Sequence, residues 1–159
     1  MDIRIFKQVP RLIFGRASFN KLSEILSGYR NSGYILFVVD HIHKKNGLIE
    51  SIPSEKNDLI LAIDTSSHEP TTDQVDKLRN HILDLKEGKI PAFIVGIGGG
   101  SALDISKAIS VMLTNDGSSR LYQGWDLVKN ESIPKMAIPT LSGTGAEASR
   151  TAVLTSENK

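Results

Sequence analysis

Residues 90–107 read IPAFIVGIGGGSALDISK, and this stretch decides the fold that the sequence predicts. Its first half is almost wholly apolar, which favours a strand buried on both faces of a parallel sheet. The run ends on the glycines 98–100, and Ser101 followed by Asp104 is a helix-start signal. Apolar residues then recur at helical spacing over residues 102–112. The sequence therefore predicts a strand, a glycine loop and a helix in direct succession.

A glycine loop between a strand and a helix is typical of a phosphate-binding turn. Glycine lets the backbone turn sharply and approach a ligand, and the amide groups of the first helical turn face the anion. The alternative is a tight turn that binds no ligand. The spacing differs from the G-x-G-x-x-G fingerprint, because Leu103 or Ser101 stands at the third glycine when counting starts at Gly98 or Gly96. A Walker A loop is excluded, since no Gly-Lys-Ser/Thr follows.

The rest of the chain alternates apolar runs with helical patterns. Further buried strands are expected at residues 34–39, 59–63 and 135–138, and further helices at residues 18–28, capped by Ser18, and 75–85. Shorter strands are expected at residues 3–6 and 11–14, as a small antiparallel edge, and at residues 151–155. This order predicts an α/β fold with a doubly wound, mostly parallel sheet.

Composition narrows the function classes. The 159 residues carry a net charge of +1 and contain no cysteine, so disulfides and thiolate metal sites are excluded. We expect no nucleic-acid partner and no membrane partner, because there is no strong basic excess and no long apolar run. The histidines, His41, His43, His68 and His81, do not have the spacing of a metal site, and no metal ligand is assigned to this chain. The default location is cytoplasmic.

Polar loops follow several of the predicted strands. In doubly wound sheets the ligand lies beyond the carboxyl ends of the strands, where Asp40 and residues 65–70, 98–101 and 140–144 would fall. This predicts an extended ligand. Asp40 could accept hydrogen bonds from both ribose hydroxyls and repel a 2′-phosphate, which favours NAD over NADP. Equally, it could cap the segment that begins at Ile42.

Two motifs give the chain a family resemblance. GGGSALDISK at residues 98–107 and IPTLSGTGAE at residues 138–147 resemble the iron-containing (group III) alcohol dehydrogenases. The resemblance implies that residues 1–159 are the Rossmann-like, dinucleotide-binding N-terminal domain of such an enzyme. It also implies a helical second domain beyond Lys159 that holds the divalent metal, iron or zinc, so that this chain carries no catalytic residue and is inactive alone.

The same resemblance implies a set of cofactor-binding residues. Asp40 would bind the adenosine ribose of NAD, the glycine loop the pyrophosphate, and Asp104 would lie beside the nicotinamide. The implied cofactor-binding residues are Asp40, Gly99, Gly100, Ser101, Asp104, Thr140, Ser142 and Thr144. The chain departs from the family pattern at Leu141, where a second threonine is common, and at Glu69, where an asparagine often stands near the adenine.

Within the family, the chain is most similar to the 3-deoxy-D-manno-octulosonate 8-oxidases. Residues 37–41, 112–115, 122–128 and 139–155 carry this likeness. It implies oxidation of the C8 alcohol of that sugar acid to an aldehyde in lipopolysaccharide modification, by a homodimer. The alternatives are another polyol or alcohol dehydrogenase of the same superfamily and a non-catalytic nucleotide-binding module.

Overall fold

The computed structural model describes residues 9–66 and 69–156. Its sheet contains β1 (Ile35–Asp40), β2 (Leu59–Ile63), β3 (Phe93–Gly98) and β4 (Lys135–Pro139) in the order β2-β1-β3-β4. All neighbouring pairs are parallel, so the carboxyl ends of the strands share one edge. The predicted parallel sheet and its α/β class are confirmed.

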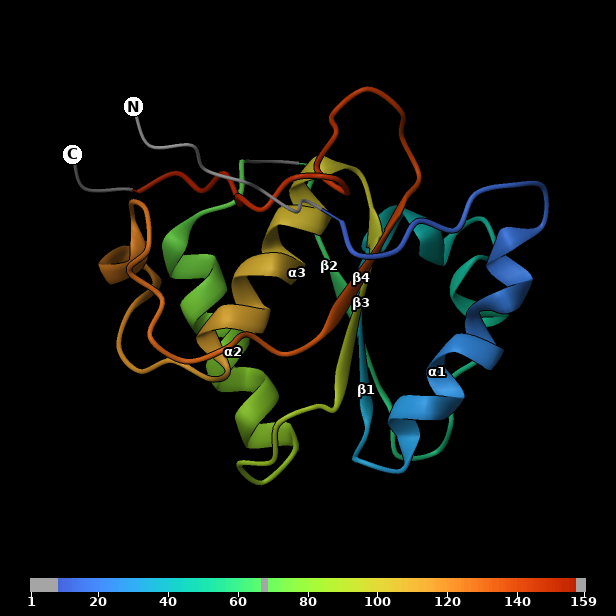
Figure 1. The fold of residues 1–159 in the computed structure, drawn as a ribbon, viewed down its shortest axis with the longest axis horizontal. Helices are drawn as coiled ribbons and strands as arrows, with labels where there is room; N and C mark the ends of the chain where they lie inside the picture. The colour runs from blue at the N-terminus through green and yellow to red at the C-terminus, as the bar shows by residue number, and fades with distance from the viewer. Residues whose placement is uncertain (1–8, 67–68, 157–159) are drawn as a thin grey trace.

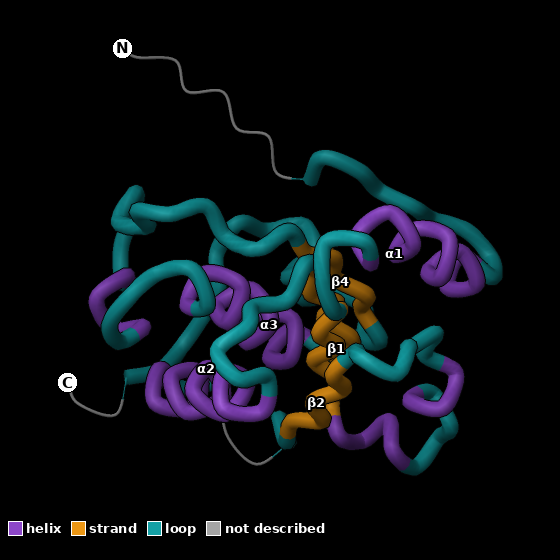
Figure 2. The backbone as a smooth tube through the Cα atoms, turned by 90° about the horizontal axis from the view of Figure 1, so that it is seen from below, coloured by secondary structure: helices purple, strands orange, loops and turns teal. Residues whose placement is uncertain are grey.

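Helices cover both faces of this sheet. They are α1 (Leu22–Arg30), α2 (Thr72–Leu85) and α3 (Gly100–Met112), with 3-10 turns η1 (Ser18–Lys21), η2 (His41–Lys44), η3 (Ile49–Ser51) and η4 (Ser119–Tyr122). In Figures 1 and 2, α2 and α3 lie on one face and α1 on the other. Within the described residues, no helix is long and apolar enough to cross a membrane.

The two faces of the sheet contribute to two separate apolar cores. Side chains alternate between the faces of a strand, so Phe37 and Val95 pack with α1, whereas Leu36 and Ile94 pack with α2 and α3. Strands β1 and β3 lie in the middle of the sheet, and their apolar side chains are buried on both faces. This explains why both strands are continuous apolar runs in the sequence.

Two glycines allow α3 to pack directly against β3. A Cβ atom at Gly96 would lie 2.3 Å from the Ser106 hydroxyl oxygen. A Cβ atom at Gly98 would lie 2.6 Å from the Ala102 Cβ, and the φ of Gly98 is +154°, a value that L-residues rarely adopt. This close packing places the N-terminus of α3 at the carboxyl end of β3.

Two of the predicted strands are wrong. Residues 11–14 form no strand, and Leu12 and Phe14 there are 81% and 95% exposed, so they have no sheet to pack against. The other half of that predicted edge, residues 3–6, lies outside the described residues. Residues 151–155 form only one isolated bridge, between Thr155 and Thr71. Their β-branched side chains favour a strand, but the segment is held by contacts from α3 instead.

The predicted helix starts are also corrected. Ser18 makes no cap, because Ala17, with φ of +59°, precedes η1, and α1 continues past Gly28 to Arg30. Helix α3 begins at Gly100, with Gly99 at its N-cap and no side-chain cap. An extended Gly99 at the N-cap allows the helix to begin two residues earlier than a cap at Ser101 predicts.

Candidate functional site

A cleft of 440 Å³ lies beside the N-terminus of α3, at the carboxyl edge of the sheet. Its walls come from α3, from the loop after β4 and from the segment that leads into α2. The lining residues are Glu69, Pro70, Gly100, Ser101, Asp104, Thr144, Ala146, Ser149, Thr151, Val153 and Thr155. Gly100, Ser101, Asp104 and Thr144, which were predicted from separate parts of the sequence, therefore share one cleft.

The backbone angles at the N-terminus of α3 do not require glycine at positions 99 and 100. Gly99 has φ of −77° and ψ of −177°, which any residue adopts, and a Cβ there would touch only a methyl group of exposed Leu141, at 3.1 Å. A Cβ at Gly100 would lie 3.2 Å from the Thr144 Cβ. In a helix the first amide groups have no partner within the helix and form its positive end. Gly100 and Ser101 line the cleft, so these amides lie at a place that suits an anion.

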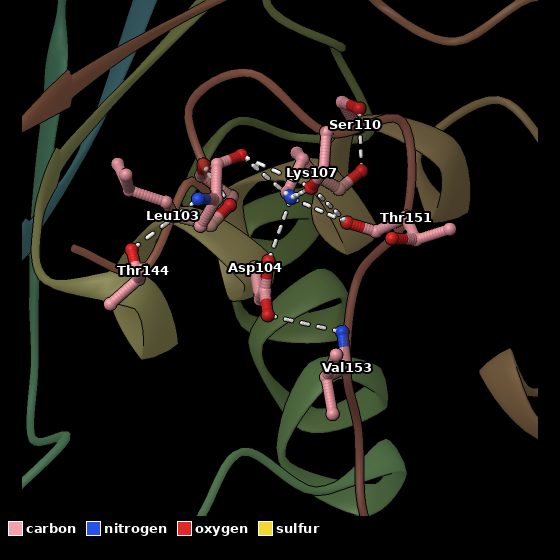
Figure 3. A network of polar contacts seen from close by, with 10 residues as sticks. Leu103, Asp104, Lys107, Ser110, Thr144, Thr151 and Val153 are labelled. Atoms are coloured by element: carbon pink, nitrogen blue, oxygen red, sulfur yellow. Dashed lines mark hydrogen bonds and ion pairs between the residues drawn. The ribbon is translucent and has the colours of Figure 1, made fainter.

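Asp104 is held by the protein on both of its carboxylate oxygens. One oxygen lies 2.7 Å from the ammonium nitrogen of Lys107, and the other accepts a hydrogen bond from the Val153 backbone amide at 3.1 Å. Figure 3 shows Asp104 between these two partners. Asp104 lines the cleft as expected, but its carboxylate is engaged in structure; its place beside a nicotinamide stays a prediction.

Lys107 connects α3 to the chain that follows β4. Its ammonium group donates to the Ala146 carbonyl at 2.9 Å, to the Ser149 hydroxyl at 3.0 Å and to the Thr151 carbonyl (Figure 3). The side chains of Lys107 and Asp104 are 11% and 12% exposed. A buried ion pair is stable only when further hydrogen bonds satisfy both groups, as they do here. The pair therefore fixes residues 146–153 as the wall of the cleft.

Asp40 caps the turn that follows β1. One carboxylate oxygen accepts the Ile42 amide at 3.2 Å, and the other accepts the Thr65 hydroxyl. The capping interpretation is thus confirmed. Asp40 also lies next to the glycine loop, since its Cβ would be 3.0 Å from a Cβ at Gly98. Its role toward a ribose stays a prediction.

The loop after β4 starts beside the glycine loop. The Thr140 amide donates to the Gly98 carbonyl at 2.9 Å, and the Thr144 hydroxyl accepts the Ala146 amide at 3.3 Å. Thr140, Ser142 and Thr144 are all exposed. The structure therefore places Thr140 beside Gly98 and Thr144 beside Gly100. Of the three, only Thr144 lines the cleft.

Three side chains near the site were missed or misjudged from the sequence. Buried His43 contacts the Thr140 hydroxyl at 3.2 Å, although its sequence neighbours give no signal of this. Lys107 was noted only as a motif position. Its spacing of three residues from Asp104 on a helix could have indicated an ion pair. Glu69 accepts the Thr155 hydroxyl at 2.8 Å and lines the cleft. In the described part of the chain, no three His, Asp or Glu side chains gather in a way that could hold a metal ion.

A parallel sheet covered by helices on both faces, with a glycine turn at a helix N-terminus, defines a Rossmann-like α/β domain. The sequence profile of the iron-containing alcohol dehydrogenases matches residues 10–159. The chain belongs to this family.

Named relatives support the same assignment. The sulfoacetaldehyde reductase of Bilophila wadsworthia is 44% identical over 86 residues, which cover 54% of this chain and 21% of that protein. The long-chain-alcohol dehydrogenase 1 of Geobacillus thermodenitrificans is 27% identical over 157 residues, 94% of this chain and 40% of that protein. The chain therefore spans less than half the length of these curated relatives.

A solved structure has the same fold. The crystal structure of sulfoacetaldehyde reductase from Bifidobacterium kashiwanohense, in complex with NAD+, matches with a TM-score of 0.77 at 24% identity. The match covers 98% of this chain and 40% of that one.

Proposed function

We propose that this chain is the NAD-binding part of an iron-containing alcohol dehydrogenase. The observation that carries the proposal is the pair Gly99 and Gly100. Neither has a positive φ. Gly100 lines the cleft at the N-terminus of α3, and a Cβ at the preceding Gly99 would meet only exposed Leu141. The family assignment and the NAD+ complex of the structural relative support the same ligand.

The residues at the sheet edge suit a dinucleotide. The amides of Gly99, Gly100 and Ser101 would hold the pyrophosphate, with Thr140, Ser142 and Thr144 contributing hydroxyl groups from the loop after β4. The carboxylate of Asp40 would accept the ribose hydroxyls and disfavour the 2′-phosphate of NADP. Asp104 would keep the wall of the cleft in place beside the nicotinamide half. When bound, NAD accepts a hydride from the alcohol carbon.

The chain's own part in the reaction is binding and orientation. The glycine loop would fix the pyrophosphate, and the wall at residues 146–153 would limit where the nicotinamide half can lie. The described residues do not fit a metal site. We therefore propose that the metal, iron or zinc, is bound by a further part of the protein beyond these residues, and that this chain alone has no turnover.

The substrate is proposed from the resemblance of residues 122–128 and 139–155. It is the C8 alcohol of 3-deoxy-D-manno-octulosonate, oxidised to the aldehyde in lipopolysaccharide modification by a cytoplasmic homodimer. The alternative, another alcohol or polyol dehydrogenase, is the one that fits the named relatives, which include a sulfoacetaldehyde reductase and a long-chain-alcohol dehydrogenase. A substrate panel assayed with a chain that includes the metal-binding part separates the candidates.

Calorimetric titration of the 159-residue chain with NAD, and separately with NADP, tests the proposed function. We expect NAD to bind and NADP to bind more weakly. Absence of any NAD binding by a chain whose thermal melt shows a folded protein would contradict the proposal. A rate assay of the same chain with NAD, alcohols and added Fe²⁺ or Zn²⁺ should show no turnover above the blank.

A further inference from the structure

Buried His43 joins the ends of two strands that flank the glycine loop. It lies in η2, directly after β1, and is 7% exposed. One ring nitrogen, Nε2, lies 3.2 Å from the Thr140 hydroxyl oxygen after β4. The other, Nδ1, lies 3.0 Å from the side-chain nitrogen of Asn46. Strand β3, which leads into the glycine loop, lies between β1 and β4 in the sheet.

The hydrogen bonds around Asn46 determine which ring nitrogen of neutral His43 carries the proton. The Asn46 side-chain oxygen accepts the Leu48 backbone amide at 3.2 Å, so the Asn46 nitrogen, a donor, must face His43. His43 Nδ1 therefore accepts, and in the neutral ring the proton is on Nε2. Nε2 then donates to the Thr140 oxygen.

This arrangement assigns a direction to the Thr140 hydroxyl group. Because its oxygen accepts from His43, its own hydrogen must be directed at a different acceptor. The Thr140 backbone amide donates to the Gly98 carbonyl at 2.9 Å, so Thr140 lies directly beside the first residue of the glycine loop. Thr140 is exposed, whereas its partner His43 is buried.

We propose that His43 is a positioning residue that orients the Thr140 hydroxyl as a hydrogen-bond donor to an acceptor oxygen of the ligand in front of α3. The inference rests on the proposed function, since the ligand is taken to be a dinucleotide. A phosphate oxygen fits because it accepts but does not donate, and so matches a hydroxyl whose hydrogen is directed away from His43.

The tautomer can be measured without any ligand. Long-range ¹H–¹⁵N correlation spectra of the histidine rings should show the proton of His43 on Nε2 at neutral pH. Assignment comes from the loss of that signal in His43→Gln. A ring protonated on Nδ1 alone would overturn the inference whether or not NAD binds.

A double-mutant cycle tests the effect on the ligand, with NAD as the titrant. His43→Leu and Thr140→Val should each weaken NAD binding by about threefold to tenfold, the scale of one neutral hydrogen bond. The double variant should be no weaker than either single variant, because both remove the same oriented donor. His43→Gln, whose amide nitrogen can donate in place of Nε2, should restore most of the affinity.

The control is His81→Leu, on the exposed surface of α2, which should bind NAD as the wild type does. Thermal melts of all variants separate unfolding from weaker binding, and His43→Gln keeps the test valid if His43→Leu fails to fold. Losses that add in the double variant, or unchanged binding in a folded His43→Leu, would overturn the inference and leave the proposed function standing. Absence of NAD binding by the wild type would instead overturn the proposed function, and the inference with it.

Discussion

Helix α3 has a buried side and an open N-terminal end, and the glycines next to the two differ in their surroundings. On the buried side, Gly96 and Gly98 face α3, and the Asp104–Lys107 pair is fully engaged. At the open end, Gly100 and Ser101 line the cleft, and Gly99 stands at the N-cap just before them. The same glycine motif therefore contains two residues that packing requires, Gly96 and Gly98, and two, Gly99 and Gly100, for which we propose a role in ligand binding.

The largest effect is expected on the buried side, at Lys107. Lys107→Met keeps the length of the side chain but removes the ammonium group, which leaves the Asp104 carboxylate buried without its cation. The free energy of unfolding should fall by about 3–5 kcal/mol, the usual cost of breaking a buried pair. Denaturant titration measures it, with Lys77→Met on the exposed surface of α2 as the matched control. A loss of less than about 1 kcal/mol would show that the pair does not anchor the wall.

Gly98→Ala should have the next largest effect. The added Cβ would meet Ala102 at 2.6 Å, and the φ of +154° strains any L-residue. The free energy of unfolding should decrease by about 2–4 kcal/mol, since overpacking and backbone strain each cost 1–3 kcal/mol. Gly28→Ala is the control: no atom lies within 4 Å of its added Cβ, so this change within α1 should stabilise by about 0.5–1 kcal/mol. A Gly98→Ala chain as stable as the wild type would contradict the packing role.

Asp40→Ser should have the smallest effect on stability. Serine is also a good N-cap, so the bond to the Ile42 amide can be kept and the change in unfolding free energy should stay below about 1 kcal/mol. The ratio of NAD to NADP affinity, measured by calorimetry, should narrow by about tenfold, because a charged acceptor is lost. Asp40→Ala, which cannot cap, separates the two roles. An unchanged ratio in Asp40→Ser would limit Asp40 to its capping role.

The sequence predicted the parts of the fold that depend on local pattern. Strands β1 and β3 are buried on both faces, and their unbroken apolar runs carry that information without any distant contact. Residues 11–14 and 151–155 have similar local patterns, but a strand also needs a neighbouring strand. Residues 11–14 form no strand, and residues 151–155 form only the single bridge at Thr155. Side-chain propensity does not encode the presence of a neighbour.

The sequence was sufficient to predict which residues lie at the candidate site. It was not sufficient to predict the side-chain contacts that they make there. Strand ends at one edge brought Asp40, the glycine loop and Thr140 together, as the topology rule for parallel sheets requires. The engagement of Asp104 and the contact of His43 with Thr140 depend on partners far along the chain, 49 residues away for the Val153 amide and 97 for Thr140. Such contacts leave no periodic pattern in the sequence.

The central claim is that Gly99 and Gly100 are glycines for the sake of a ligand. The most direct measurement is NAD titration of Gly99→Val beside its thermal melt. The backbone at Gly99 accepts any residue, and the added Cβ meets only the flexible end of Leu141, so we expect a folded chain with a melting temperature near that of the wild type. NAD affinity should nevertheless fall at least tenfold, because the side chain occupies the space in front of the amides. A folded Gly99→Val chain that binds NAD as tightly as the wild type would contradict the account.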